Sequence, residues 1–349
     1  MSITEASVQT SQLSTHYLDS GGDGQPVIFV HGNASSGEFF RETLRRLPAR
    51  LRGLAPDLRG YGKSEAKPVD ATRGLDEFAA DLHSFIEKLD LAAAGKKVYL
   101  AGWSLGGGVV MRYATQHPEL VAGLILLAPM SPYGFGGTRG ISGDPCTADF
   151  AGSGGGGASP EFVGRLRKKD RSSDSPQSPR NVMNSFYFKP PFRLTPEAEE
   201  AAVTSLLEMQ LGADNYPGDS EASQHWPGIA PGKRGINNAL SPKYCNLSAF
   251  AAVQPQPKVL WIRGADDQIV SDTSLFDLGF LGQLGAVPAW PGATTFPPQP
   301  MVSQMRAVLD AYRQAGGQYQ ELVFSDCGHS PHLEKADAFH EALEGFVQS

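Results

Sequence analysis

Short apolar runs alternate with amphipathic stretches between residues 12 and 130, and this alternation limits the possible folds more than any other feature of the chain. Within residues 75–89, apolar side chains recur at helical spacing and form one stripe that must cover a sheet face. Strand and helix patterns in alternation are typical of an α/β fold. The sequence therefore predicts a mostly parallel central sheet flanked by helices. The expected buried strands are Val27–Val30, Leu54–Ala55, Val98–Ala101, Val121–Leu127, Val259–Ile262 and Leu322–Phe324.

This rhythm stops after Met130. Of the 40 glycines and 26 prolines in the chain, 21 and 19 fall within residues 131–300. We expect residues 131–160 to be loop, since they follow neither the helical nor the strand period. Two helices are predicted further on, one starting at Ser159-Pro160-Glu161 and one running from Thr195-Pro196-Glu197 to Gly212, because each start combines a capping side chain, a proline and a carboxylate. Residues 271–300 form a second irregular stretch, before helices at 301–315 and at the C-terminus.

Composition excludes several classes of protein. Hydrophobic residues make up 40% of the 349 and charged residues 19%, which predicts a soluble globular protein. A net charge of −7 argues against nucleic acid or an anionic membrane surface as partner. The three cysteines have no metal-like spacing, and the polar start Met1–Ser14 lacks the features of a secretion signal. We therefore expect a cytoplasmic protein.

The sharpest chemical signal is the segment Gly102–Gly107, Gly-Trp-Ser-Leu-Gly-Gly, which follows a predicted strand and opens a predicted helix. A serine hydroxyl is a weak nucleophile, so it must be presented on a tight turn where a base can reach it. Glycines two residues before and after Ser104 give the backbone room for such a turn. The same turn places the amide of Leu105 at a helix N-terminus, where it can stabilise an oxyanion.

A second signal, His31-Gly32-Asn33, ends the first buried strand. In a parallel sheet this end lies beside the end of the Ser104 strand, where ligands bind. The amide of Asn33 is therefore a candidate second oxyanion donor, and His31 is interpreted as a structural hydrogen-bonding residue.

Two further strand ends supply an acid and a base. Asp266 and Asp267 follow the strand at 259–262, and His329 and His332 follow the last strand. A histidine base needs a carboxylate that fixes its tautomer, so one aspartate and one histidine complete the set that starts with Ser104. The chain order serine, aspartate, histidine is expected of one sheet architecture.

With these residues the chain resembles the α/β-hydrolase superfamily over residues 12–130 and 256–349. The loop Asp57–Ser64 also matches the superfamily pattern D-x-R-G-x-G-x-S, which supports the fold and not the substrate. The resemblance implies an α/β-hydrolase fold with a cap inserted after the sixth strand. On this reading residues 1–130 and 256–349 form the core, residues 131–255 the cap, and residues 271–300 an additional rim loop within the core.

The resemblance also assigns roles. Ser104 is implied as the nucleophile, His329 as the general base and acid, and the amides of Asn33 and Leu105 as the oxyanion hole. Asp267 is implied as the acid because the superfamily usually uses the residue three positions after the glycine; Asp266 is the alternative. His329 is preferred to His332 because it directly follows a glycine.

The stretch from His31 to Phe40 is also similar to the haloalkane dehalogenase loop, in which an asparagine and a neighbouring tryptophan bind halide. Dehalogenases and epoxide hydrolases use an aspartate nucleophile, whereas position 104 is serine. Trp103 is therefore a candidate wall of the substrate pocket, or a packing residue beneath the turn.

The function expected from the sequence is a serine hydrolase that cleaves a carboxylic ester or lactone of a small to medium, partly apolar molecule. It needs no metal and no organic cofactor. Carbon–carbon bond hydrolysis, amide hydrolysis and cofactor-free perhydrolysis use the same triad and stay open, as does a non-catalytic receptor on the same scaffold. The aromatic clusters Phe186–Phe188 and His225–Trp226 lie in the segment expected to choose the substrate.

Overall fold

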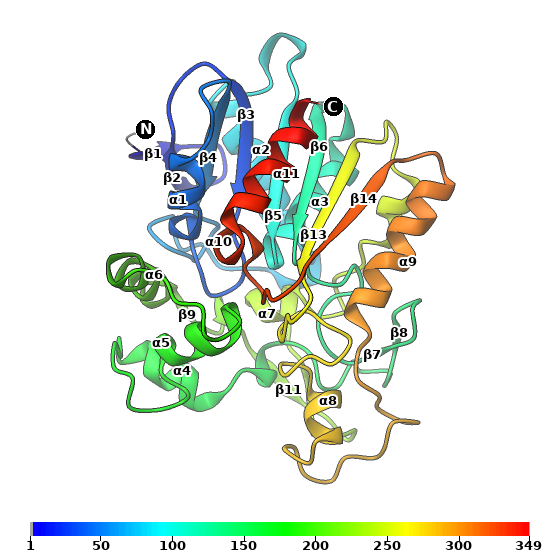
Figure 1. Cartoon of the computed structure of the whole chain (residues 1–349). Coiled ribbons are helices and arrows are strands. Elements are labelled where there is room, and N and C mark those ends of the chain that lie inside the picture. The colour runs from blue at the N-terminus through cyan, green and yellow to red at the C-terminus, as the bar shows by residue number, and fades with distance from the viewer. Residues whose placement is uncertain (1–2, 349) are drawn as a thin grey trace.

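A twisted eight-stranded sheet forms the centre of the molecule in the computed structural model, which describes residues 3–348 (Figure 1). The strand order is β1-β2-β4-β3-β5-β6-β13-β14. The first two pairings are antiparallel, and all pairings from β4 to β14 are parallel. The strands are β1 Thr4–Gln9, β2 Ser14–Asp19, β3 Gln25–Val30, β4 Leu51–Pro56, β5 Val98–Trp103, β6 Val121–Leu127, β13 Lys258–Gly264 and β14 Tyr319–Phe324.

Helices cover both faces of this sheet, with α2, α3 and α9 on one face and α1 and α11 on the other (Figure 1). The predicted apolar stripe lies on α2, where Phe78, Leu82 and Phe85 are buried. The mostly parallel sheet flanked by helices confirms the fold class that the sequence predicts. These helices are α1 Arg41–Arg45, α2 Asp76–Lys88, α3 Leu105–Gln116, α9 Met301–Gln314, α10 Pro331–Glu334 and α11 Ala336–Gln348, with single turns η1 Gly37–Phe40, η2 Ala71–Arg73, η3 Ala93–Gly95 and η4 Pro118–Leu120.

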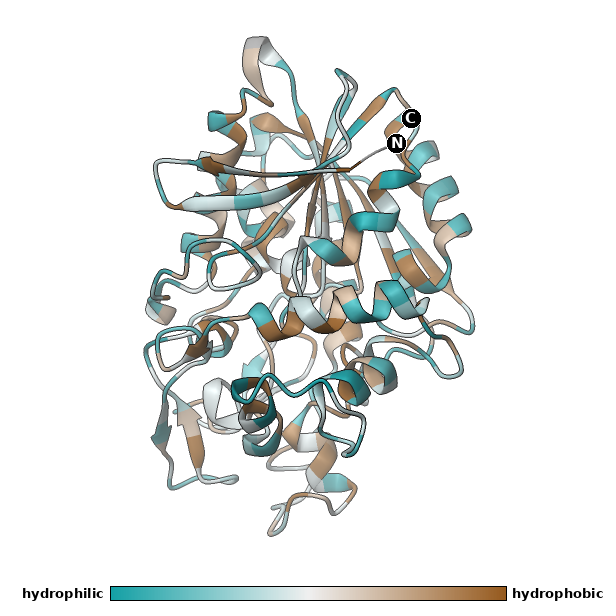
Figure 2. Ribbon diagram, turned by 90° about the vertical axis from the view of Figure 1, so that its left-hand side faces the viewer, coloured by the Kyte–Doolittle hydropathy of each residue, from teal (hydrophilic) through white to brown (hydrophobic). Residues whose placement is uncertain are grey.

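The hydrophobic core follows the central strands. Every residue of β5 is buried, and β3, β6 and β13 are buried along most of their length. Figure 2 shows hydrophobic residues along these strands and hydrophilic residues on the outer sides of the helices. Strands buried on both faces carry continuous apolar runs, and the sequence patterns detect these strands for that reason.

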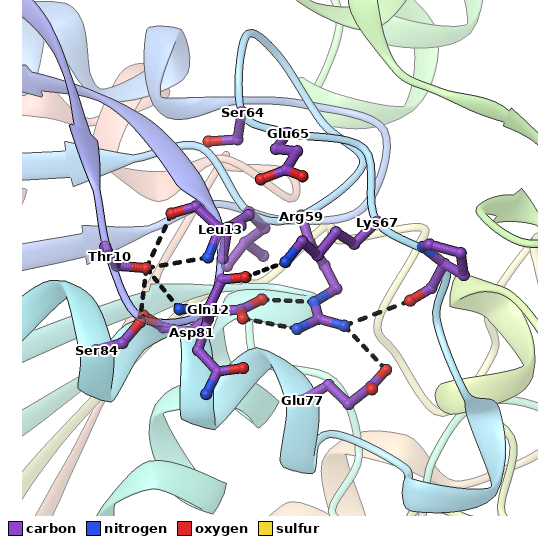
Figure 3. A network of polar contacts seen from close by, with 12 residues as sticks. Thr10, Gln12, Leu13, Arg59, Ser64, Glu65, Lys67, Glu77, Asp81 and Ser84 are labelled. Atoms are coloured by element: carbon purple, nitrogen blue, oxygen red, sulfur yellow. Dashed lines mark hydrogen bonds and ion pairs between the residues drawn. The ribbon is translucent and has the colours of Figure 1, made fainter.

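The hairpin β1–β2 is the part of the sheet that the sequence patterns do not single out, because β1 is largely exposed and polar. Its turn is fixed to α2: the Ser84 hydroxyl donates to Thr10 Oγ1 at 3.1 Å (Figure 3). Nearby, the buried guanidinium of Arg59 makes two bonds of 2.6 and 2.7 Å to Asp81 and one contact of 3.0 Å to Glu77. Arg59 belongs to the predicted D-x-R-G loop, and these contacts are structural.

Residues 131–255, which we call the insertion, come between β6 and β13 in the sequence and lie at the carboxyl ends of the parallel strands (Figure 1, green). Both predicted helices are present, and each has a serine or threonine cap followed by proline. The second helix ends at Glu208, four residues before the predicted end, because Leu211–Gly212 pairs with Tyr216–Pro217. The elements of the insertion are β7 Thr138–Arg139, β8 Asp144–Pro145, η5 Gly155–Gly157, α4 Pro160–Arg167, α5 Pro179–Val182, η6 Met183–Tyr187, α6 Pro196–Glu208, β9 Leu211–Gly212, β10 Tyr216–Pro217, β11 Ser220–Ala222, β12 Ile229–Pro231, α7 Ile236–Ala239 and η7 Ser248–Ala252.

Residues 131–160 are more ordered than the sequence predicts. The short pair β7–β8 lies within them, and two buried glutamines hold their backbone. Gln299 Nε2 donates to the Gly134 carbonyl at 3.1 Å, and Gln304 Nε2 donates to the Gly140 carbonyl at 2.9 Å. The prediction of loop alone for this stretch was wrong, because its contacts come from residues more than 150 positions later in the chain. The segment 271–300 contains one helix, α8 Leu278–Gln283.

No helix among residues 3–348 combines the length and the apolarity needed to cross a bilayer.

Candidate active site

Four loops meet at the carboxyl ends of β3, β5, β13 and β14, and a cavity of about 340 Å³ opens above them. Ser104, His329, Asn33 and Leu105 all line this cavity. Candidate residues from three distant parts of the sequence thus share one cavity. Asp267 lies behind His329 and is buried.

Ser104 occupies a strained turn between β5 and α3. Its backbone has φ +56° and ψ −117°, values that a residue with a side chain rarely adopts. The flanking glycines are required by space: a Cβ on Gly102 would collide with the carbonyl of Gly106, and a Cβ on Gly106 with the carbonyl of Val30. The pattern of glycines around Ser104 therefore follows from the close approach of α3 to β3 and β5.

His329 forms a buried pair with Asp267. Its Nδ1 lies 2.8 Å from Oδ2 of Asp267, and both side chains are 3% exposed. The other carboxylate oxygen of Asp267 accepts the amides of Ile269 and Val270 at 2.8 and 3.0 Å. A proton on Nδ1 that is shared with a carboxylate leaves Nε2 of His329 as a hydrogen-bond acceptor.

The two alternatives left open by the sequence lie elsewhere. Asp266 is exposed and pairs with Lys189 Nζ at 2.9 Å. His332 is buried outside the cavity lining, and its ring packs against Phe40 and Trp103 with centroid distances of 4.7 and 5.2 Å. Burial in these surroundings lowers the pKa of His332 to about 3, so the ring is neutral near pH 7.

The loop that carries His329 is held by two side chains. Glu334 accepts the amides of Gly328 and Ser330 at 2.9 and 3.1 Å, and also the amide of Lys189, from the insertion, at 2.7 Å. The indole N–H of Trp103 donates to the His329 carbonyl at 2.7 Å. Sequence reasoning missed Glu334, and its only signal was a carboxylate in the short helix that follows His329.

The turn at Asn33 and Ala34 is held largely from the insertion. The Tyr187 hydroxyl donates to the Ala34 carbonyl at 2.8 Å, and Nδ2 of Asn33 donates to Oδ1 of Asn237 at 2.9 Å. Tyr61 donates to Oδ1 of Asn33 at 2.6 Å. Ala34 has φ +47°, a strained value that such contacts must stabilise.

These contacts bear on the similarity to the dehalogenase loop. The side-chain amide of Asn33 and the indole N–H of Trp103 are both engaged by protein acceptors. The indole has a single N–H, so Trp103 leaves no donor for a halide. Trp103 is buried and lines the cavity, and its ring packs against Phe39 at a centroid distance of 5.3 Å.

His31 lies outside the cavity lining and is fully buried. Its Nε2 accepts the amide of Leu58 at 2.9 Å, and its Nδ1 lies 2.8 Å from the Gly32 carbonyl. Burial lowers the pKa of His31. This geometry agrees with the structural part predicted for it.

Most of the cavity wall is apolar or aromatic and comes from the insertion and from residues 275–281. Phe186 from the insertion and Phe276 from the later segment meet edge to face at 5.1 Å. Of the aromatic clusters noted in the sequence, Phe186 and Tyr187 reach the wall, whereas Trp226 packs on Phe296. Within residues 3–348, no aspartate, glutamate, lysine or arginine lines the cavity, and no three metal-ligating side chains converge on one point.

Comparison with known proteins matches this geometry to one family. The model of the Alpha/beta hydrolase family matches residues 27–342. A non-heme chloroperoxidase, CPO-A1, of Kitasatospora aureofaciens is 38% identical over 28% of this chain and 33% of its own length. A 2-hydroxy-6-oxo-6-(2'-aminophenyl)hexa-2,4-dienoic acid hydrolase of Metapseudomonas resinovorans is 32% identical over 35% of this chain and 41% of its own length.

The chain thus spans less than half the length of these curated relatives. Among solved structures, an esterase from Exiguobacterium antarcticum superposes with a TM-score of 0.61 at 18% identity, and the match covers 99% of this chain and all of that one. At this identity the likeness concerns the fold. The family match covers nearly the whole chain, and the chain belongs to the Alpha/beta hydrolase family.

Proposed function

We propose that the protein is a serine hydrolase that cleaves a carboxylic ester or lactone of a small to medium, partly apolar molecule through an acyl-enzyme. The observation that carries this proposal is the buried His329–Asp267 pair, at 2.8 Å, at the wall of the cavity that Ser104 also lines. A nucleophile, a base and a carboxylate that orients the base are the parts that acyl transfer requires.

In the proposed mechanism, Ser104 Oγ attacks the substrate carbonyl and His329 Nε2 takes the hydroxyl proton. Asp267 keeps the imidazole in the required tautomer and stabilises the imidazolium. The oxyanion of the tetrahedral intermediate accepts hydrogen bonds from the amides of Asn33 and Leu105. His329 then protonates the leaving alkoxide, and the acyl group stays on Ser104.

Water completes the reaction. His329 removes a proton from the water that attacks the acyl carbonyl, and a second tetrahedral intermediate forms. Its collapse releases the carboxylic acid and returns the proton to Ser104.

We also propose that residues 131–255 act as a cap and residues 271–300 as a rim. Both supply cavity walls: Phe135, Phe162 and Phe186 come from the insertion, and Phe276 and Leu281 come from the later segment. A cover of this kind chooses the substrate and excludes water from the acyl-enzyme.

Hydrolysis of a carbon–carbon bond is the second candidate, because one relative is named as the hydrolase of a dienoic acid. We rank it below ester hydrolysis. A dienoic acid brings a carboxylate, and among the described wall residues the cavity offers it no lysine or arginine as a partner. The test mixes the enzyme with a 2-hydroxy-6-oxo-dienoic acid and, separately, with p-nitrophenyl esters. Cleavage of the esters, with no loss of the absorbance of the dienoic acid, would favour ester hydrolysis.

The test of ester hydrolysis compares wild type with Ser104→Ala. We expect Ser104→Ala to lower kcat on p-nitrophenyl butyrate by about 10⁴-fold or more. A fluorophosphonate probe should add its mass to wild type and not to Ser104→Ala. Ser185→Ala, at an exposed serine of the insertion, is the matched control and should keep both properties. Full turnover by Ser104→Ala would overturn the proposal.

A further inference from the structure

We propose that the cavity accepts only substrates whose enclosed portion carries no charge, and that Gln177 is the wall position at which an added charge would change this selectivity. The inference rests on the proposed ester hydrolysis and names the substrate class of that site.

The first observation is the charge of the wall. Apart from His329, the described side chains that line the cavity are aliphatic, aromatic, hydroxyl or amide groups, which carry no charge near pH 7. Burial raises the pKa of Tyr216 to about 12 and also raises that of Tyr187, so both phenols stay neutral. An anionic or cationic group that enters the cavity would lose water without gaining a counter-charge.

Basic residues near the cavity are already committed to acidic partners. Arg180, three positions after Gln177, pairs with Glu199 and Glu200. Lys189 pairs with Asp266 at 2.9 Å and with Asp326 at 2.8 Å. Swinging either side chain toward a substrate would break two ion pairs, so neither residue provides a ready counter-ion.

Most polar side chains of the wall are also engaged within the protein. Nδ2 of Asn33 donates to Asn237, and the Tyr187 hydroxyl donates to the backbone of Ala34. Ser153 bonds to Ser241 at 2.7 Å, and Ser159 caps α4. Each of these side chains makes at least one bond within the protein, and that bond fixes its position in the wall.

Gln177 differs from them. It lies in the loop before α5, is half-buried, and lines the cavity. Its backbone amide donates to Ser175, but its side-chain amide has no partner within residues 3–348. A primary amide offers both a donor and an acceptor without charge. Gln177 is therefore suited to read a neutral polar group, such as a second carbonyl or a hydroxyl, on an otherwise apolar substrate.

The experiment compares two esters of equal chain length, p-nitrophenyl hexanoate and the mono-p-nitrophenyl ester of adipic acid, which differ in one terminal carboxylate. For wild type we expect kcat/KM to favour the neutral ester by 100-fold or more. Gln177→Lys places a cation at the wall and should raise kcat/KM for the adipate ester by at least 10-fold while lowering it for the hexanoate ester.

Gln314→Lys is the matched control, because it makes the same charge change at an exposed position of α9 and should leave the ratio as in wild type. Gln177→Leu should keep the preference for the neutral ester, since it adds no charge. A wild-type ratio within 3-fold of unity, or equal shifts from Gln177→Lys and Gln314→Lys, would overturn the inference.

Binding separates this inference from the proposed function. Equilibrium dialysis of Ser104→Ala with the p-nitroanilides of hexanoic acid and of adipic acid measures the charge preference without turnover. Tighter binding of the hexanoic anilide by 30-fold or more supports the inference even where both esters resist hydrolysis. Equal binding of the two anilides would overturn it, even where ester hydrolysis is established.

Discussion

The adjacent residues Asp266 and Asp267 differ in burial and in the partner that each carboxylate contacts. Asp267 is buried against His329, whereas Asp266 faces solvent and pairs with Lys189. We expect Asp267→Asn to lower kcat for p-nitrophenyl esters by about 10³- to 10⁴-fold, because an amide at this place favours the wrong tautomer of His329. Steady-state kinetics at pH 7.5 measures the loss.

Asp266→Asn is the natural control for that change. It removes an exposed ion pair, and exposed pairs contribute little free energy, so we expect kcat within 2-fold of wild type. The assignment of Asp267 as the acid fails if Asp266→Asn is the variant that loses turnover.

The Tyr187 hydroxyl supports the strained turn at Ala34 through a hydrogen bond to the Ala34 carbonyl. Tyr187→Phe keeps the ring and removes this support. We expect kcat to fall by about 10-fold with KM changed less than 2-fold, because the turn would present the Asn33 amide less well to the oxyanion. Tyr113→Phe removes a phenol hydroxyl from α3, outside the cavity wall, and should change neither constant. A rise in KM at unchanged kcat would instead place Tyr187 among the substrate contacts.

At the scale of elements, the approach of α3 to β3 predicts opposite effects for one substitution at two places. Gly106→Ala would drive a methyl group into the Val30 carbonyl, so we expect the free energy of unfolding to fall by about 3 kcal/mol. Gly164→Ala lies in α4 with open space around it, and should raise the free energy of unfolding by about 0.5–1 kcal/mol. Urea unfolding of both variants measures the two signs, and equal losses would contradict this account.

Local signals, such as burial on both faces and helix caps, explain which elements the sequence could predict. Strands β3, β5, β6 and β13 are buried on both faces, so their apolar runs stand out. Helices α4 and α6 are marked by their caps and prolines. The hairpin β1–β2 and the short pair β7–β8 lack such local signals, because long-range pairing and side chains from distant residues hold them in place.

The candidate site divides in a similar way. Ser104, Asp267 and His329 each follow a predictable strand, so the topology of a parallel sheet brings their loops together. Tyr187, Asn237 and Gln177 lie in the insertion, where no periodic pattern indicates which way a side chain points. Their places depend on tertiary packing, which the sequence patterns do not encode.

For the whole molecule, buried neutral histidines predict acid sensitivity. Burial lowers the pKa of His332 to about 3 and that of His340 to about 4, below the value of about 6.5 expected for an unfolded chain. Between pH 6.5 and 4 the unfolded state therefore binds protons that the folded state does not, and stability falls as the pH falls. One such histidine accounts for about 2 kcal/mol between pH 7.5 and pH 5.

Urea unfolding at pH 7.5 and at pH 5 checks this prediction. His332→Phe, which suits the aromatic surroundings, should reduce the difference between the two free energies of unfolding by about 1–2 kcal/mol. His225→Phe, at an exposed position, should leave the difference as it is in wild type. Equal differences in wild type and His332→Phe would show that other groups cause the acid sensitivity.

Three of the hydrogen bonds between the insertion and the loops of the candidate site have a consequence for protein engineering. Tyr187 and Asn237 reach the turn at Asn33, and the Lys189 amide reaches Glu334 beneath the His329 loop. A chimera that exchanges residues 131–255 for the equivalent part of another hydrolase would remove these hydrogen bonds together with the pocket walls. Such a graft would need to carry a hydroxyl, an amide side chain and a backbone N–H at the same three places before a new substrate range could be paired with a useful turnover rate.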